Sequence, residues 1–139
     1  MESRIKLELR IDWSEIDLFG HVNNLAIFKY VQAARVNYME MIGLMQLQAE
    51  IKTGPILASA TCQFRKPLFY PGKVIVYSRV DAIKNSSFHL QHEIKNDDGE
   101  IAAEAHDIIV MYDFGKKHKF NIPEEIKDKI TLLNKTLIK

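Results

Sequence analysis

The stretch LAIFKYVQAARVNYMEMIGL, Leu25–Leu44, repeats apolar side chains at the three- and four-residue spacing of an α-helix. Asn23 and Asn24 precede it and are good N-cap residues, while Gly43 offers a stop near its end. Because polar side chains are few, this helix is apolar on nearly all sides, and the rest of the chain must wrap around it. Its periodic apolar positions are Ile27, Tyr30, Val31, Ala34, Tyr38 and Met41.

The rest of the chain has mainly the two-residue period of β-strands, with Pro and Gly marking the turns. Strands are predicted at Arg4–Ile11, Ile56–Arg65, Lys73–Ile83, Ser87–Lys95 and Glu100–Asp113, and the turn Asn96–Gly99 predicts a hairpin. A short last helix is expected after Pro123, with an apolar stripe formed by Ile126, Ile130, Leu133 and Leu137. This order predicts an α+β fold, with a single antiparallel sheet of about five strands around one long helix.

Length and charge narrow the function classes. A chain of 139 residues is the size of one domain, so a single domain over residues 1–139 is expected. A net charge of +1 argues against a nucleic-acid partner, although the segment after Phe114 is rich in lysine. One cysteine provides no disulfide, and no apolar run suits a signal core or a membrane span. A cytoplasmic protein with no membrane partner is therefore expected.

The segment between the first strand and the long helix carries a carboxylate and an imidazole. It reads WSEIDLFGHVNN from Trp13 to Asn24 and contains Asp17 and His21. The first N–H groups of a helix lack partners and carry the positive end of its dipole, so they suit a developing oxyanion. Asp17 beside them can act as a base or a nucleophile in acyl transfer or hydrolysis. The same spacing also fits a plain turn, with His21 and Asn23 bracing the helix.

This loop and the helix after it resemble those of the hot-dog-fold acyl-CoA thioesterases, and more narrowly the 4-hydroxybenzoyl-CoA thioesterase-like group. The motif DLFGHVNN at Asp17–Asn24 is also similar to that of plant acyl-ACP thioesterases. The likeness runs from about Ile5 to Ile130, because later landmarks follow in the same order. These are FRKPL at Phe64–Leu68, YPG at Tyr70–Gly72, SSF at Ser86–Phe88, Asp113-Phe114 and IPEE at Ile122–Glu125.

The resemblance implies a hot-dog fold and a homodimer with active sites at the interface, or a homotetramer of such dimers. It assigns the catalytic acid to Asp17, and the backbone donors that polarise the thioester carbonyl to the region of Asn23 and Asn24. His21 is placed with these catalytic residues, as an orienting group or as a base.

The substrate-binding residues expected from the resemblance are Phe19, Gly20, Arg65, Lys66, Ser86 and Ser87. The plant enzymes have an asparagine where this chain has Phe19, which predicts an apolar wall near the acyl group instead. The two cations suit coenzyme A phosphates, and the two serines lie in the family near the pantetheine arm or the partner's active site. Solvated strand ends and turn hydroxyls are the structural alternatives.

No metal site is predicted, and no cofactor beyond the coenzyme A of the substrate. His89 and His92 have an odd separation on one strand, so their side chains point to opposite faces, and His106 is expected to be isolated. Cys62 is expected to be a packed side chain. Arg35 lies off the polar stripe of its helix and is expected to extend past its neighbours or to pair with an acid of a partner chain.

The leading prediction is therefore an enzyme, a thioesterase that hydrolyses an acyl-CoA to the free acid and coenzyme A. Two alternatives stay open at this point. The acyl group can be carried by acyl carrier protein, or the chain can bind an acyl-CoA without turnover.

Overall fold

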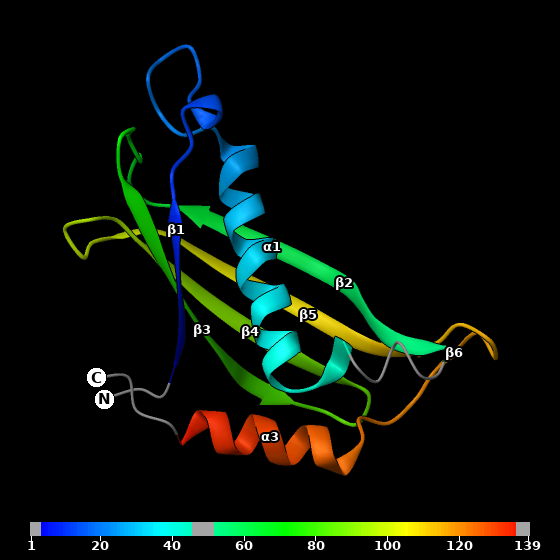
Figure 1. The fold of residues 1–139 in the computed structure, drawn as a ribbon. Helices are drawn as coiled ribbons and strands as arrows, with labels where there is room; N and C mark the ends of the chain where they lie inside the picture. Colours follow the sequence, from blue (N-terminus) through cyan, green and yellow to red (C-terminus); the bar gives the residue numbers. More distant parts are fainter. Residues whose placement is uncertain (1–3, 46–51, 136–139) are drawn as a thin grey trace.

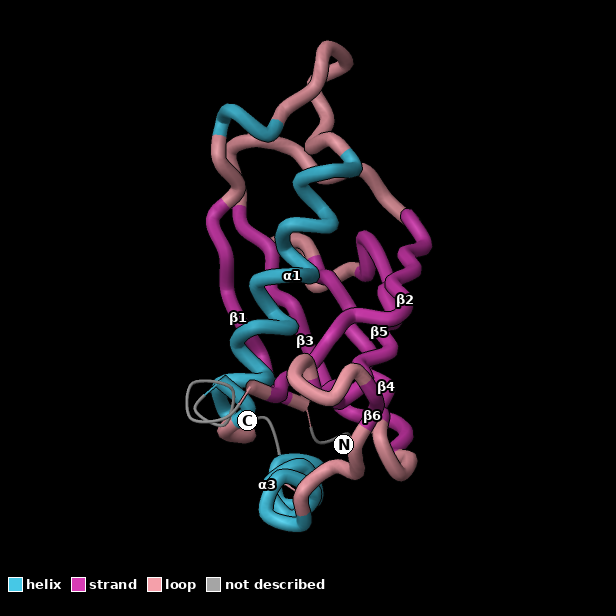
Figure 2. Tube along the Cα trace, turned by 90° about the vertical axis from the view of Figure 1, so that its right-hand side faces the viewer, coloured by secondary structure: helices cyan, strands magenta, loops and turns pink. Residues whose placement is uncertain are grey.

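An antiparallel sheet of six strands carries the fold, with the central order β1-β3-β4-β5-β2 and β6 paired with β5. The structure is a computed structural model that describes residues 4–45 and 52–135. Helix α1 crosses one face of the sheet, and α3 lies at one end of it (Figures 1 and 2). The elements are β1 (Ile5–Arg10), η1 (Trp13–Glu15), α1 (Asn24–Met41), β2 (Thr53–Phe64), β3 (Lys73–Ile83), β4 (Ser87–Lys95), β5 (Ile101–Asp113), β6 (His118–Lys119) and α3 (Glu124–Asn134).

The predicted strands are all present, and β3 and β4 have the predicted bounds. Strand β2 begins at Thr53, three residues earlier than predicted. The prediction started it later because Gly54 and Pro55 are residue types that usually mark a break. Pro55 is tolerated there since β2 is an edge strand, where a missing N–H costs no ladder bond. The hairpin turn is confirmed: Asn96 Oδ1 accepts from the N–H groups of Asp98 and Glu100 at 3.0 and 2.9 Å.

Helix α1 begins one residue before the predicted Leu25 and ends at Met41, three residues before the predicted Leu44. Asn23 is the N-cap, and its Oδ1 accepts from the N–H of Ala26 at 2.8 Å. Gly43 follows the C-cap with a φ of +83°, a left-handed conformation that suits glycine. The expectation that this helix is wrapped on most sides is wrong for the single chain, because the sheet packs on one face only. Met41 is 45% exposed, and Leu25 and Phe28 also face outward.

The core lies between α1 and the sheet in two clusters. The first joins the N-terminal half of the helix, including Ala26 and Tyr30, to strands β3 and β5. The second joins its C-terminal half, including Tyr38, to α3, which contributes the buried Ile126 and Ile130 of the predicted stripe. Leu137 of that stripe lies outside the described residues. No helix within the described parts of the chain is long and apolar enough to cross a membrane.

Candidate active site at the start of helix α1

The loop between β1 and α1 is built by its own side chains. Asp12 caps η1 by accepting from the N–H of Ser14 at 3.0 Å, and Glu15 completes a capping box with the N–H of Asp12 at 2.8 Å. Asn23 closes the loop, since its backbone N–H and its side-chain amide both donate to the carbonyl of Glu15. The loop therefore holds Asp17 at a defined place ahead of the helix.

Asp17 lies in a tight turn in which only one of its two carboxylate oxygens accepts hydrogen bonds. Its Oδ1 accepts from the N–H groups of Phe19 at 2.9 Å and His21 at 3.1 Å. Gly20 has a φ of +84° in this turn, which explains glycine at that position. Asp17 Oδ2 has no hydrogen-bond partner among the described residues. One oxygen thus orients the carboxylate through two backbone N–H groups, and the other makes no hydrogen bond within the described residues.

The N-terminus of α1 supplies the electrostatic partner. Asn24 and Leu25 occupy the first two helical positions, where the helix geometry offers no carbonyl acceptor for their N–H groups. Asn23 Oδ1 already serves the N–H of Ala26, so these two donors stay available at the positive end of the dipole. Asn23 therefore caps the helix end, while the backbone N–H of Asn24 lies at the first helical position.

A cavity of about 280 Å³ joins these groups to the cations downstream. Its apolar wall comes from β2 and the segment after it, together with the helix. Ten residues line it: Asp17, His21, Val22, Asn24, Ile27, Phe64, Arg65, Lys66, Pro67 and Leu68. Five of the predicted site residues are thus brought together, namely Asp17, His21, Asn24, Arg65 and Lys66.

The two cations at this cavity are held loosely. Arg65 lies 3.5 Å from Glu104, and Lys66 pairs with Glu100, with all four side chains well exposed. Surface ion pairs of this kind contribute little, so both cations are free to turn toward an anionic ligand. Lys66 also borders a neighbouring cavity of about 360 Å³, where Asp97, Asp98 and Glu100 offset the positive charge.

The other predicted substrate contacts do not reach this cavity within one chain. Phe19 is 81% exposed in the single chain and does not line this cavity, whereas Phe64 and Ile27 do. Phe64 packs edge-on against the ring of Phe28 at 6.2 Å. Ser86 and Ser87 lie at the far end of the sheet, where Ser87 pairs with Val110 while Phe64 pairs with Ala103.

His21 and Glu15 have supporting contacts around Asp17. The His21 ring packs edge-on against Phe69, with ring centroids 5.2 Å apart. Glu15 Oε1 accepts from the hydroxyl of Tyr30 at 2.6 Å, which ties the loop to α1. Burial, and then this bond to Glu15, raise the pKa of Tyr30 above its ordinary value. Sequence reasoning missed Glu15, although its spacing of three from Asp12 is a capping signal.

A polar line crosses the core on the helix-facing side of the sheet. Ser78 Oγ lies 2.7 Å from His92 Nδ1, and His92 Nε2 lies 2.8 Å from Asp107 Oδ2. Arg35 of α1 pairs with the same Asp107 oxygen at 3.0 Å. The expectation that Arg35 pairs with an acid of a partner chain is therefore replaced by an internal pair.

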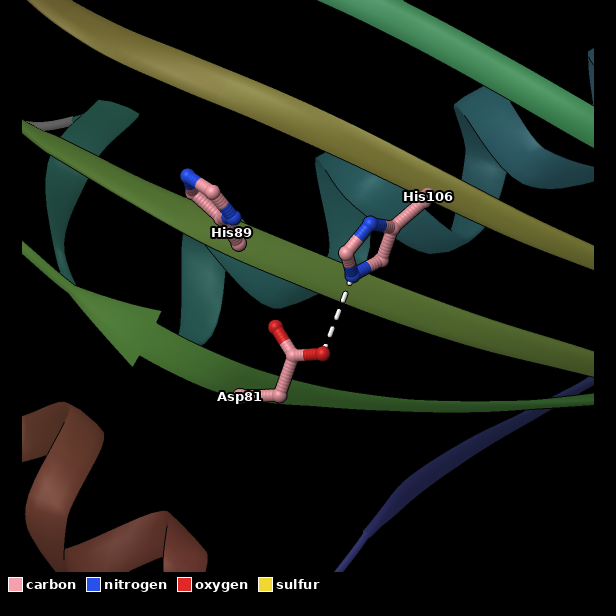
Figure 3. Close-up of side chains that lie close together, drawn as sticks. All are labelled: Asp81, His89 and His106. Carbon is pink, nitrogen blue, oxygen red and sulfur yellow. Dashed lines mark hydrogen bonds and ion pairs between the residues drawn. The ribbon is translucent and has the colours of Figure 1, made fainter.

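The remaining histidines and the cysteine lie as follows. His92 is buried, whereas His89 faces the opposite side of the sheet, as the strand period predicts. His106 is not isolated as expected: it lies beside His89 and Asp81 on that opposite face (Figure 3). Cys62 packs against the core, and burial followed by the charge of Asp107 raises the pKa of its thiol.

Comparisons with known proteins identify the family and the fold of the chain. The sequence model of the thioesterase-like superfamily matches residues 11–130. The chloroplastic acyl-acyl carrier protein thioesterase ATL3 of Arabidopsis thaliana is 31% identical over 127 residues, 89% of this chain and 66% of that protein. The chain spans 62% to 66% of the lengths of the curated relatives it matches.

Two solved structures share the fold. A thioesterase of Thermus thermophilus, solved with coenzyme A and Zn, has a TM-score of 0.84 at 24% identity and covers 99% of this chain and 100% of that one. The DHNA-CoA thioesterase of Staphylococcus aureus has a TM-score of 0.82 at 19% identity and covers 94% and 93%. The predicted hot-dog fold is thus confirmed. The match over 120 residues shows that this chain belongs to the thioesterase-like superfamily.

Proposed function

We propose that this chain hydrolyses acyl-CoA thioesters to the free acid and coenzyme A, with Asp17 as the catalytic carboxylate. The observation that carries the proposal is the half-used carboxylate of Asp17 beside the unpaired N–H groups at the start of α1. Family membership supports the class of reaction, and the coenzyme A in the Thermus thermophilus structure supports the carrier.

The reaction needs one proton acceptor or nucleophile and one oxyanion site. In the base route, Asp17 Oδ2 takes a proton from water, and the water oxygen attacks the thioester carbonyl carbon. In the nucleophile route, Oδ2 attacks the same carbon and water then cleaves the anhydride. In both routes the N–H groups of Asn24 and Leu25 stabilise the oxyanion, and its collapse expels the coenzyme A thiolate.

The cavity supports a phosphate-bearing substrate with an apolar acyl group. Phe64, Ile27 and Leu68 offer apolar surface, while Arg65 and Lys66 offer cations at the cavity rim. The guanidinium of Arg65 suits the paired oxygens of a phosphate group. Asn24 lines the same cavity, which supports a binding mode with the carbonyl end of the acyl group beside the helix N-terminus.

We also propose a homodimer that completes the site. Strand β2 is a twelve-residue edge strand whose Ile56, Leu57 and Phe64 side chains are partly exposed, a surface that favours strand pairing. Phe64 ends this strand at the cavity, so a second chain paired along β2 would meet the site. Light scattering that shows a monomer with full activity would contradict this part of the proposal.

The test of the chemistry uses Asp17→Asn, which keeps the size of the side chain. We expect kcat/KM on a panel of acyl-CoA thioesters to fall about 10²- to 10⁴-fold, with the fold and the oligomeric state unchanged. Asp128→Asn on the exposed face of α3 is the matched control and should retain full activity. Undiminished hydrolysis by the Asp17 variant would refute the proposal.

The oxyanion site has a sharper test at Asn24, the first helical residue. Proline is well tolerated at this position, and Asn23 before it already has an extended backbone with ψ of 156°. Asn24→Pro removes one N–H donor and should lower kcat about 10²- to 10³-fold. Asn24→Ala keeps the N–H and is the control. Equal activities of the two variants would exclude this N–H from catalysis.

The alternatives of carrier and of turnover have direct assays. Comparing kcat/KM on matched acyl-CoA and acyl-ACP substrates decides the carrier. Acyl carrier protein is a specific alternative because the chain is similar to the plant acyl-ACP thioesterase. A thiol-trapping assay decides turnover. Saturable binding of acyl-CoA without thiol release would identify a binding protein instead.

A further inference from the structure

Three side chains with metal-binding atoms meet on the sheet face opposite to α1. They are Asp81 of β3, His89 of β4 and His106 of β5, and their candidate ligand atoms all lie within 4.8 Å of one another. Figure 3 shows them converging in front of the sheet, with the helix behind it. None of them borders the cavity at Asp17.

The pairing of the strands explains why they meet. His106 lies directly opposite Gln91, and His89 lies opposite Ile108, so the two histidines are diagonal neighbours on one face. Their rings pack edge-on with centroids 5.9 Å apart. Strand β3 has a register shift between Val80 and Ala82, which makes Asp81 the extra residue of a bulge. Its Oδ2 lies 3.0 Å from His106 Nε2.

We propose that Asp81, His89 and His106 bind one divalent transition-metal ion of the Zn²⁺ class, with a fourth coordination position open to solvent. Two imidazoles and one carboxylate are a ligand set that Zn²⁺ takes readily, whereas Mg²⁺ and Ca²⁺ prefer oxygen ligands. A surface ion pair uses only Asp81 and His106, whereas a metal ion would use all three side chains that the strand pairing brings together.

The geometry needs only a small contraction. Bond lengths of about 2.0–2.2 Å in a tetrahedral zinc site separate neighbouring ligand atoms by about 3.3–3.6 Å. Asp81 Oδ2 and His106 Nε2, at 3.0 Å, must move apart by a few tenths of an ångström, while the widest separation in the cluster, up to 4.8 Å, must close by about 1 Å. Partly exposed side chains achieve this by rotation. His106 would bind the ion through an unprotonated Nε2, so a proton on that nitrogen would move to Nδ1 or, from a doubly protonated ring, to solvent.

The surroundings of the cluster add one more carboxylate, that of Glu104, which also pairs with Arg65 at 3.5 Å. The cavity of about 320 Å³ beside Asp81 and His106 is lined by Glu104 and by neutral side chains that include Gln91 and Thr61. A bound ion would link β3, β4 and β5 on the face away from the candidate active site. It is therefore expected to stabilise the sheet and to leave the chemistry at Asp17 unchanged.

The experiment titrates ZnCl₂ into chelator-treated, dialysed protein by calorimetry, with thermal unfolding as a second measurement. We expect one Zn²⁺ per chain and a higher melting temperature, because the ion binds the folded state. The double variant His89→Ala/His106→Ala should lose both effects. Asp81→Asn should weaken Zn²⁺ binding by at least about 10- to 100-fold. Removing a residue that only hydrogen-bonds to a metal ligand already weakens metal affinity by this factor, and Asp81 is proposed as a ligand itself. His118→Ala, an exposed histidine elsewhere, is the control.

Three outcomes would overturn the proposal. They are the absence of saturable Zn²⁺ binding, binding that the double variant retains, and binding that His118→Ala weakens as much as Asp81→Asn does. Circular dichroism checks that each variant is folded. Because Asp81 lies at an exposed bulge, Asp81→Asn keeps the test decisive even if the double variant fails to fold.

Discussion

Strands β3, β4 and β5 place a histidine beside an aspartate on each face of the sheet, in two opposite environments. Toward α1 lie Ser78, His92 and Asp107, each at most 2% exposed. Toward solvent lie Asp81 and His106, whose side chains are 34% and 43% exposed. Asp81 Oδ2 and His106 Nε2 are also at hydrogen-bond distance, 3.0 Å apart. The same residue types at nearly the same distances therefore serve different purposes.

Access and charge balance decide what each set can do. The buried set has the residue types of a Ser-His-Asp triad, but the serine lies on Nδ1 and the aspartate on Nε2, the reverse of the protease arrangement. A substrate cannot reach side chains this buried, and Arg35 balances the Asp107 charge. The inner set is thus structural, whereas the outer set is open to ions.

The largest effect is expected from Asp107→Ala. This change leaves the Arg35 guanidinium, 13% exposed, and the buried His92 Nε2 without their partner. Breaking a buried ion pair by removing one side costs about 3–5 kcal/mol, so we expect a loss of this size in the free energy of unfolding. Urea denaturation measures it.

A second variant sharpens this result. Arg35→Met combined with Asp107→Asn removes the unpaired cation and should regain part of the lost stability. If Asp107→Ala costs less than about 1 kcal/mol, the range of a surface pair, then the inner set is not buried in solution and the contrast between the two faces fails.

A smaller loss is expected from Ser78→Ala. The variant removes one hydrogen bond and leaves His92 Nδ1 without it in the core, which costs about 1–3 kcal/mol. The same denaturation curves measure it. If Ser78→Ala lowers the free energy of unfolding as much as Asp107→Ala does, then the hydrogen bond of Ser78, and not the ion pair, contributes most of the stability of the buried set.

The smallest effect is expected on the outer face. Asp81→Ala removes an exposed partner of His106 and should change the free energy of unfolding by at most about 1 kcal/mol in metal-free buffer. Thermal unfolding with a chelator present checks this. A larger loss would mean that Asp81 is needed for the bulge itself, and the outer set would then be structural as well.

Much of the fold was predictable because local periodicity is strong in this chain. The ends of β3 and β4, the Asn23 cap and the Gly43 stop all follow from residue types whose backbone preferences are local. The start of β2 was missed because Gly54 and Pro55 disfavour a central strand but not an edge strand. The sequence did not predict that the sheet covers only one face of α1. Periodicity shows that the helix surface is apolar, but it does not show whether the same chain or a second chain buries that surface.

The candidate site was predictable in part. Asp17, His21 and Asn24 are neighbours in sequence, so their meeting is local, while Arg65 and Lys66 reach them only through the path of β2. Phe64 reaches the cavity because it ends the edge strand β2, a position that periodicity alone does not give. His106 meets His89 because strands β4 and β5 pair across the Asn96–Gly99 turn. Counting residues back from that turn along both strands already suggests that the two histidines are close.

Sequence by itself determined the helix, the strands, the turn residues and the loop that holds Asp17, because each depends on side chains a few residues apart. Tertiary structure decided which side chains each histidine meets, where the Arg35 charge is neutralised, and which cations border the cavity. These contacts join residues far apart in the chain, and the sheet order and the bulge at Asp81 set them. Local preferences do not encode the strand register that brings such residues together.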